Sequence, residues 1–323
     1  MKARALAIRH YYGIDWHMEG EKYTAVVEHG KGVFQDADAP RGPWWSLSKT
    51  ALATAALALV QRGELELDSP LAGHEFTLRH LLRHSAGLPD YGDLADYHLA
   101  VSAGHTPWSY EELFTRVEAN RLRSTPGTCF RYSNIGYTIV RMMIEEKTGL
   151  IIGDALKTLV FDPLEIDDVY VATRPEELVV DGWGSARGYN PGWVFHGLIV
   201  STPLRAALFL GRLFEGRLIN SRHLEFMRNA VTLFSQGPVG DRPWNSMGYG
   251  LGLMIDMKSP LGPCYGHTGT GPGSTTATYI FSAPPIARAI SVFSTVDNQG
   301  AVERDVLSLA EQFNSVPETR RSP

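Results

Sequence analysis

The longest apolar run in the chain covers residues 51–60, and Thr54 is its only polar member. A helix without a polar face is buried on all sides, so this run predicts a helix through the middle of the molecule. Gln61-Arg62-Gly63 follows, and glycine is the usual residue in the left-handed position just past a helix end. The pattern therefore predicts a central helix that stops before Gly63.

Further helical patterns fill the middle of the chain and recur near its end. Ser109-Tyr110-Glu111-Glu112 is a capping box that opens one helix, and Gly149 closes another. The remaining helical patterns cover residues 77–84, 134–148, 151–160, 203–214, 221–229 and 301–313.

Strand-like runs lie toward both ends of the chain. Residues 23–28 and 33–34 flank the turn Gly30-Lys31-Gly32, and four later runs are separated by Gly or Pro. These later runs cover residues 249–257, 263–269, 275–282 and 287–295. Strands at both ends with helices between them predict one sheet built from the two termini, with a helical region inserted.

Composition narrows the class of protein. The 323 residues, of which 44% are hydrophobic, can form one large domain or two of ordinary size. A net charge of -5 provides no positive field, and no basic cluster with interleaved aromatics occurs, so we expect no nucleic-acid partner. Cys129 and Cys264 are too few for a disulfide framework, and we expect two buried thiols.

Neither the start of the sequence nor its longest apolar run has the pattern of a signal peptide or a membrane span. Arg4 and Arg9 interrupt the apolar residues at the start of the sequence, and the run 51–60 is far below the roughly 20 residues of a membrane span. We expect a cytoplasmic protein without a membrane span, or a periplasmic or secreted one if a leader has been removed. The sequence makes no prediction of the oligomeric state.

Ser46 and Lys49 lie just before the apolar run. In a helix their spacing places the two Cβ atoms roughly 5 to 6 Å apart on one face. A serine hydroxyl is a poor nucleophile until a neighbour takes its proton, and a lysine in apolar surroundings can do so because its pKa is lowered. The pair is a candidate nucleophile and base, although Ser-x-x-Lys alone also occurs by chance.

A second candidate cluster is Tyr132-Ser133-Asn134, before the predicted helix 134–148. An ammonium nearby would lower the pKa of Tyr132 by favouring the phenolate, so Tyr132 could be a general base. The amide of Asn134 could hold a substrate carbonyl. The simpler alternative is a helix N-cap beside an ordinary buried tyrosine.

A third cluster, His267-Thr268-Gly269-Thr270, closes a strand-like run before Gly271-Pro272-Gly273. The backbone amides of Thr270 and Ser46 could form an oxyanion hole, in which one donor contributes about 3 kcal/mol. The simpler alternative is a glycine-rich hairpin. A nucleotide loop is disfavoured because no helix follows the glycines.

The three clusters together resemble the serine β-lactamase and penicillin-binding protein superfamily, in which Ser-x-x-Lys occurs with Ser-Asp-Asn and Lys-Thr-Gly. Tyrosine in the second motif points to the class C β-lactamase-like branch, with its D-alanyl-D-alanine carboxypeptidase and family VIII-type esterase relatives. Further matching segments are residues 81–89, 131–137 and 248–252.

The resemblance implies an α/β (α+β) fold in which terminal helices flank an antiparallel sheet and an all-helical domain is inserted. We expect residues 1–75 and 193–323 to form the sheet domain and residues 76–192 the helical insertion, with the active site between them. The resemblance implies a small-molecule substrate and neither a cofactor nor a metal.

Residue roles follow position by position from the resemblance. Ser46 would be the acylated nucleophile, Lys49 its proton partner, and Tyr132 the base that activates Ser46 and later the deacylating water. The amides of Ser46 and Thr270 would form the oxyanion hole. The implied substrate-binding residues are Asn134, His267, Thr268 and Gly269. His267 and Thr268 would meet a substrate carboxylate.

The chain departs from the family pattern at two places. His267 stands where class C β-lactamases usually carry lysine, and an imidazole with a pKa near 6.5 would bind an anionic substrate less well as the pH rises. His196 stands where family members tend to have paired glycines. His80 and His84 have metal-ligand spacing but no third ligand, so we expect structural roles for both.

The expected function is a serine hydrolase that forms a covalent acyl-enzyme on small esters, amides or D-amino-acid peptides, with at most weak β-lactam hydrolysis. A class C-like β-lactamase and a penicillin-binding or sensory module without turnover are the alternatives. Specificity should lie in the loops 90–106 and 182–196, which no motif describes.

Overall fold

The computed structural model describes residues 20–178, 188–233, 240–282 and 286–315. Its strands are β1 (Lys22–Glu28), β2 (Lys31–Gln35), β3 (Gly42–Pro43), β4 (Tyr170–Ala172), β5 (Leu198–Ser201), β6 (Val231–Thr232), β7 (Met247–Tyr249), β8 (Met254–Asp256), β9 (Cys264–Gly271), β10 (Ser274–Phe281) and β11 (Arg288–Ser294). Its α-helices are α2 (Ser48–Gln61), α3 (Leu78–Leu82), α4 (Ala95–Ser102), α5 (Tyr110–Arg116), α6 (Asn134–Thr148), α7 (Ile152–Leu156), α8 (Pro203–Phe214), α9 (Ser221–Arg228) and α10 (Gln299–Ser315).

The two ends of the chain build one antiparallel sheet. Among the described residues its strand order is β2-β1-β11-β10-β9-β8-β7-β6. β1 pairs with β11 from Lys22 opposite Ser294 to Glu28 opposite Arg288, so the first and last strands lie side by side. The sheet predicted from both termini is confirmed. β9 and β10 form a hairpin around Pro272, which agrees with the hairpin alternative for the glycine-rich segment.

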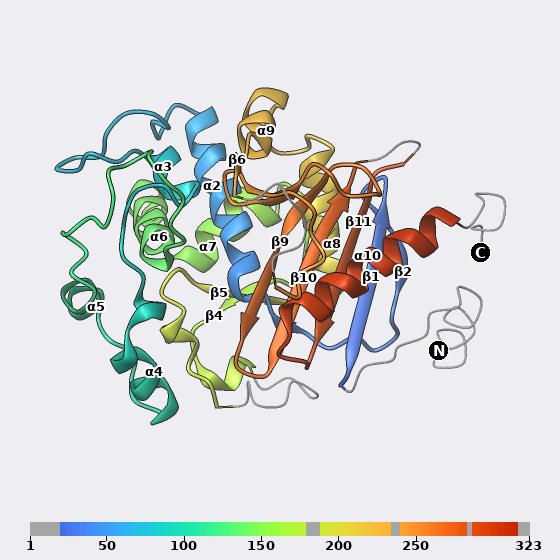
Figure 1. Ribbon diagram of the computed structural model, residues 1–323, viewed down its shortest axis with the longest axis horizontal. Coiled ribbons are helices and arrows are strands. Elements are labelled where there is room, and N and C mark those ends of the chain that lie inside the picture. Colours follow the sequence, from blue (N-terminus) through green and yellow to red (C-terminus); the bar gives the residue numbers. More distant parts are fainter. Residues whose placement is uncertain (1–19, 179–187, 234–239, 283–285, 316–323) are drawn as a thin grey trace.

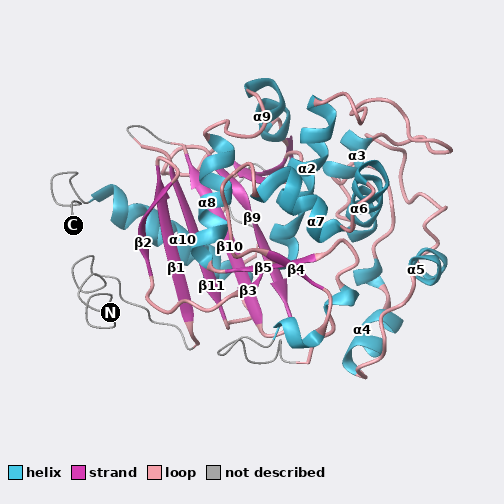
Figure 2. Cartoon of the chain, turned by 180° about the vertical axis from the view of Figure 1, so that it is seen from behind, coloured by secondary structure: helices cyan, strands magenta, loops and turns pink. Residues whose placement is uncertain are grey.

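Helices cover both faces of this sheet. α10 crosses one face in Figure 1, and α8 lies against the other face in Figure 2. Under α10, the buried side chains of Val306 and Phe313 pack with those of Val26 and Ile290. The expected antiparallel sheet with flanking helices is confirmed, and one flanking helix is terminal while α8 comes from the middle of the chain.

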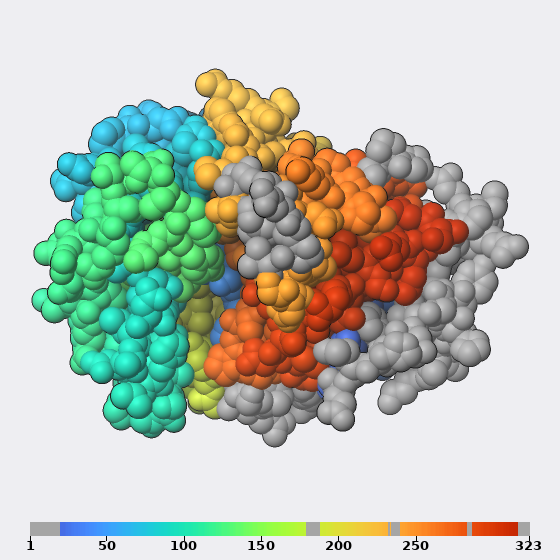
Figure 3. Space-filling view, viewed as in Figure 1, coloured from blue at the N-terminus to red at the C-terminus, as the bar shows by residue number. Residues whose placement is uncertain are grey.

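The predicted central helix is α2. Every residue from Ser48 to Leu59 is buried, and Gly63 follows with a φ of 74°. Helices α3 to α6 lie on the side of α2 away from β1 and β2 (Figure 1). In the space-filling view the helical segments and the C-terminal strands gather at opposite sides of the molecule (Figure 3). The domain boundaries at residues 75/76 and 192/193 stay a prediction.

The structure corrects several local predictions. The run 249–257 is two strands, β7 and β8, because the chain turns back at Gly252, whose φ is 74°. The short sheet β3-β5-β4 was not predicted, since its strands have two to four residues. The expected specificity loop 90–106 contains α4. The other expected specificity loop, 182–196, lies partly outside the described residues. Cys264 is buried as expected, whereas Cys129 is exposed.

Within the described ranges, no helix combines the length and the apolar character that crossing a bilayer requires. The start of the sequence, on which the targeting prediction depends, lies outside the described residues.

Candidate active site

Ser46 lies in the 3₁₀ turn Trp45–Leu47 that leads into α2, and Lys49 lies in the first turn of that helix. Lys49 Nζ is 3.1 Å from Ser46 Oγ. Ser46 is half-buried, whereas Lys49 is completely buried. The sequence therefore predicted correctly that this hydroxyl and this amine meet.

Burial changes the protonation of Lys49. Desolvation penalises the ammonium and lowers the pKa of Lys49 to about 7, and the negative charge of Asp90 opposes this shift. A substantial fraction of the amine is thus neutral at pH 7, with a lone pair that can accept the Ser46 proton. This agrees with the predicted role of Lys49 as a proton partner.

Tyr132 lies on the loop before α6 and approaches Ser46 from the helical side. Its hydroxyl donates to Ser46 Oγ over 2.8 Å. Burial raises the pKa of Tyr132 above its ordinary value, and Asp90 adds to the rise, so the expected lowering by an ammonium is wrong. Lys49 Nζ lies 5.1 Å from the Tyr132 ring centroid, and its charge does not offset desolvation. Tyr132 is therefore a neutral O–H donor here.

Asn134 faces the same pocket but has a partner that the sequence did not indicate. Its backbone N–H donates to Asp90 Oδ1 over 2.8 Å, and its Nδ2 donates to Asp90 Oδ2 over 3.1 Å. A carboxylate only accepts hydrogen bonds, so it fixes the amide with Oδ1 as the free side. The Oδ1 acceptor of Asn134 is thus available to a substrate N–H, and its second Nδ2 hydrogen to a substrate carbonyl, so the predicted substrate-binding role stays a prediction.

Strand β9 approaches the Ser46 turn closely because the two of its residues that face this turn, Gly269 and Gly271, are glycines. A Cβ on Gly269 would lie 2.2 Å from Trp44 O and 2.6 Å from Ser46 N, and one on Gly271 would lie 2.4 Å from the Trp45 ring. The strand can therefore bring Thr270 beside the Ser46 backbone. This geometry supports an oxyanion hole made of the Ser46 and Thr270 amides, which stays a prediction.

Trp45 strains the backbone immediately before the nucleophile. Its φ is 46°, which is rare for an aromatic residue. The indole Nε1 donates to Ser274 Oγ over 2.9 Å, and the ring packs edge-on against Tyr189. These contacts hold the strained turn that presents Ser46. This strain could not be predicted, since a positive φ cannot be inferred from a tryptophan in the sequence.

The two side chains expected to meet a substrate carboxylate face other partners. His267 Nε2 accepts from Tyr249 Oη over 2.9 Å, and its Nδ1 donates to Thr268 O over 2.7 Å. Thr268 Oγ1 donates to the buried Glu303 over 2.6 Å. Neither side chain is among the residues that line the pocket beside Ser46. Both side chains belong to β9, and their role in substrate binding stays a prediction.

The expected pKa of His267 near 6.5, and with it the expected loss of charge as the pH rises, is wrong. Burial and the nearby Lys49 lower the pKa of His267 to about 3, so the ring is neutral at physiological pH and cannot lose charge between pH 6 and 8. His84 completes the same network, since its Nδ1 accepts from Ser133 N and its Nε2 lies 3.2 Å from Tyr249 Oη. His80 Nδ1 accepts from Thr77 N, so His80 and His84 both have structural roles.

The pocket beside Ser46 has a volume of about 270 Å³. Its lining comes from the Ser46 turn, the segment before α4, α4 itself, the start of α6, the segment before β5, and the β9–β10 turn. Besides Ser46, Asn134 and Thr270 its lining includes Trp45, Tyr91, Gly92, Tyr97, His98, Val101, Tyr189, Val194, His196, Gly271 and Pro272. The pocket is largely aromatic, and no lysine or arginine is among these described residues.

Comparison with known proteins agrees with this geometry. Residues 23–312 match the family model described as Beta-lactamase. Penicillin-binding protein 4* of Bacillus subtilis (strain 168) is 24% identical over 256 residues, which cover 72% of this chain and 56% of that protein. Esterase EstB of Burkholderia gladioli is 31% identical over 157 residues, which cover 42% of this chain and 40% of the esterase.

Among solved structures, a D-stereospecific amidohydrolase from Streptomyces sp. superposes with a TM-score of 0.75 at 23% identity, over 98% of this chain and 100% of that one. This likeness shows the shared fold. The chain spans about half the length of the curated relatives it matches, 56% and 40% respectively. Since the family model covers nearly all of the described residues, the chain belongs to the Beta-lactamase family.

Proposed function

We propose that this chain is a serine hydrolase that acts through a covalent acyl-enzyme on small esters and amides, including D-amino-acid derivatives. The observation that carries the proposal is that Ser46 Oγ lies 3.1 Å from Lys49 Nζ and 2.8 Å from Tyr132 Oη. A hydroxyl between a partly neutral amine and a phenol is an activated nucleophile.

In the acylation step Ser46 Oγ bonds to the substrate carbonyl carbon while its proton moves to the lone pair of Lys49 Nζ. The negative charge that develops on the carbonyl oxygen would be stabilised by the Ser46 and Thr270 amides. The Lys49 ammonium then returns this proton to the leaving alkoxide or amine as the bond between it and the carbonyl carbon breaks. In the deacylation step water attacks the carbonyl carbon of the acyl-enzyme while its proton moves to Lys49 Nζ. The bond to Ser46 Oγ then breaks, and Ser46 takes the proton back from Lys49.

The pocket lining favours substrates without a carboxylate. No lysine or arginine is among its described residues, and the neutral His267 does not reach it. A β-lactam or a free D-alanyl-D-alanine terminus brings an anionic group that would have no cationic partner here. We therefore expect amides and esters to be better substrates than nitrocefin, with at most weak β-lactam hydrolysis.

The names of the relatives support the same choice. One curated relative is an esterase, and the superposed Streptomyces protein is a D-stereospecific amidohydrolase. The geometry of Asn134, which leaves an acceptor toward the pocket, suits a substrate that carries an N–H. Amides of D-amino acids provide that group, so they are our first choice of substrate.

The test is Ser46-dependent acylation. Purified protein is incubated with a fluorophosphonate probe and with a p-nitrophenyl ester, in the wild type and in Ser46→Ala. Ser308→Ala, which changes a hydroxyl on the exposed side of α10, is the matched control. We expect labelling and turnover in the wild type and the control, and neither in Ser46→Ala. Equal labelling of all three proteins would refute the proposal.

Turnover separates a hydrolase from a module that only becomes acylated. We expect a steady release of p-nitrophenol after any burst, because Lys49 remains available to take a proton from the attacking water. A burst of one equivalent without steady release would instead identify a module that only becomes acylated, and rapid nitrocefin hydrolysis would identify a β-lactamase.

A cytoplasmic location stays a prediction, which fractionation of expressing cells tests.

A further inference from the structure

His196 is the pocket residue whose role neither the motifs nor the proposed chemistry explains. It lies just before β5, is only 3% exposed, and lines the pocket beside Ser46. Its Nε2 is 3.3 Å from Lys49 Nζ. Among the described residues, Lys49 Nζ thus has two hydrogen-bond neighbours, Ser46 Oγ and His196 Nε2. A glycine at position 196 would leave Lys49 Nζ with Ser46 Oγ as its one hydrogen-bond neighbour among the described residues.

The tautomer of His196 follows from the protonated state of Lys49. An ammonium has three donors and no acceptor, so the facing Nε2 must accept and the ring proton must lie on Nδ1. Burial, followed by the charge of Lys49, lowers the pKa of His196 well below its ordinary value and keeps the ring neutral. The hydrogen bond from Nζ to Nε2 can therefore persist when Lys49 loses its proton.

We propose that His196 is a positioning residue that accepts one N–H of Lys49 and thereby directs the lone pair of the neutral amine toward Ser46 Oγ. This inference rests on the proposed function. A neutral amine has two donors and one lone pair, and rotation about the Cε–Nζ bond would otherwise turn the lone pair away from the serine. Only the orientation with the lone pair on Ser46 accepts the proton during acylation.

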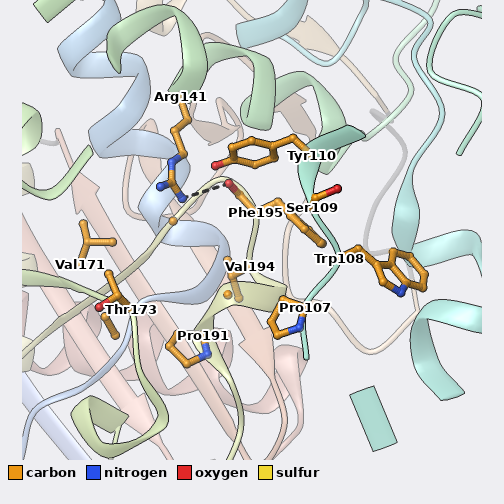
Figure 4. Close-up of a pocket in the computed structure, with 13 residues that line it drawn as sticks. Pro107, Trp108, Ser109, Tyr110, Arg141, Val171, Thr173, Pro191, Val194 and Phe195 are labelled. Atoms are coloured by element: carbon orange, nitrogen blue, oxygen red, sulfur yellow. Dashed lines mark hydrogen bonds between the residues drawn. The ribbon is translucent and has the colours of Figure 1, made fainter. Parts of the chain in front are cut away.

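The backbone around His196 is held in a tight turn, while the ring itself has Lys49 Nζ as its hydrogen-bond neighbour and its Nδ1 is buried without a partner among the described residues. Gly197 has a φ of 100°, and its N–H donates to Val194 O over 2.7 Å, which closes a tight turn around His196. On the other side of this turn, Arg141 donates to Phe195 O over 3.3 Å (Figure 4). Arg141 is itself held by Glu145 over 3.2 Å. A ring carried on such a turn can fix the direction of a hydrogen bond.

The pocket in Figure 4 has a volume of about 450 Å³ and shares Val194 with the pocket beside Ser46. The turn that carries His196 therefore lies between two cavities. His196 lines the one beside Ser46, where it also contacts Lys49. Substitutions of His196 can be chosen that keep the side-chain volume and change only the acceptor.

The test compares His196→Gln with His196→Met, whose side chains are similar in length. Glutamine Oε1 can accept the Lys49 N–H, whereas the methionine side chain offers only a weak acceptor. With a p-nitrophenyl ester we expect kcat to fall about 10- to 100-fold in His196→Met with little change in KM, and His196→Gln to recover much of this loss. Imidazole added to His196→Gly should restore activity in a saturable manner, which also serves if the methionine variant does not fold.

Equal kcat in the wild type and His196→Met would overturn the inference, and so would a loss that appears mainly in KM, since that would make His196 a substrate ligand. Equal loss in the glutamine and methionine variants, without rescue of the glycine variant by imidazole, would also overturn it. The wild type separates the two proposals. Without Ser46-dependent labelling in the wild type the proposed function fails, whereas labelling that is equally fast in His196→Met removes only the role of His196.

Discussion

At the scale of single residues, the site depends on which groups are charged. Lys49 is the decisive one, because an ammonium cannot take a proton from Ser46. Burial brings the pKa of Lys49 to about 7, while burial raises the pKa of Tyr132 and keeps the phenol protonated. These opposite shifts have one cause, since desolvation favours the neutral form of each group. In the proposed mechanism they favour Lys49 as the base and Tyr132 as a hydrogen-bond donor.

Activity should therefore follow the titration of Lys49. For a neutral ester, kcat/KM should rise about tenfold per pH unit below pH 7 and become level above it, because only the neutral amine is active. Asp90→Asn should move this limb to lower pH, since the Asp90 charge raises the pKa of Lys49. A pH profile from 5 to 9, in buffers of constant ionic strength, measures both. A flat profile would contradict the assignment of Lys49 as the base.

The buried histidines make a separate prediction about stability. The pKa of His267 is lowered to about 3, and those of His84 and His196 are also lowered by burial. The unfolded chain, with histidine pKa values near 6.5, then binds more protons than the folded one below that pH. Their contribution to stability is complete above pH 6.5 and is lost as the pH falls, by up to about 1.4 kcal/mol per pH unit for each histidine.

Urea unfolding at pH 7.5 and at pH 5.5 measures this loss. We expect a lower free energy of unfolding at pH 5.5, and a smaller pH effect in His267→Phe, which has one fewer buried imidazole. Stability that stays constant or increases on acidification would show that these rings are protonated in the folded state.

At the scale of elements, the sequence predicted more of the scaffold than of its contacts. α6 and α8 have the predicted bounds because capping residues, glycine and proline mark their ends. The turn between β7 and β8 escaped prediction because an apolar run continues through it. Ser46, Lys49 and Tyr132 were found because each lies in a local motif. The contacts of His196 with Lys49 and of Asp90 with Asn134 were not, because 147 and 44 residues separate the partners.

The close approach of β9 to the Ser46 turn gives an element-scale prediction. Gly269→Ala places a methyl group 2.6 Å from Ser46 N, so the strand must move away and the Thr270 amide with it. We expect kcat to fall by about 10²- to 10³-fold, the effect of losing one oxyanion donor. Gly153→Ala in α7 is the control, because its added Cβ would meet Val171 at 3.7 Å, an ordinary contact.

Circular dichroism should show that both alanine variants are folded. Normal activity in the Gly269 variant would mean that β9 does not contribute to the oxyanion hole, whereas a comparable loss in the Gly153 variant would make the effect nonspecific.

At the scale of the whole molecule, the predicted sheet domain and helical insertion share one hydrophobic core. The same buried cluster includes Leu57 of α2, Ile144 of α6, Leu210 of α8 and Phe293 of β11. α2 belongs to this cluster along its length, so neither part can lose it without exposing apolar surface in the other. The catalytic residues lie where these parts join, and their geometry depends on that joint core.

We therefore expect the described parts of the chain to unfold together. In urea, far-UV circular dichroism and tryptophan fluorescence should report one transition with the same midpoint, since Trp108 and Trp244 lie in different parts of the structure. Leu57→Ala, which opens a cavity at the centre of α2, should lower the free energy of unfolding by about 2 to 5 kcal/mol and move both signals equally. Two separated transitions, with only one of them sensitive to Leu57→Ala, would show instead that the helical insertion is an independent folding unit. Ser46-dependent labelling would then disappear with the first transition, because the loss of either part separates Ser46 from Tyr132.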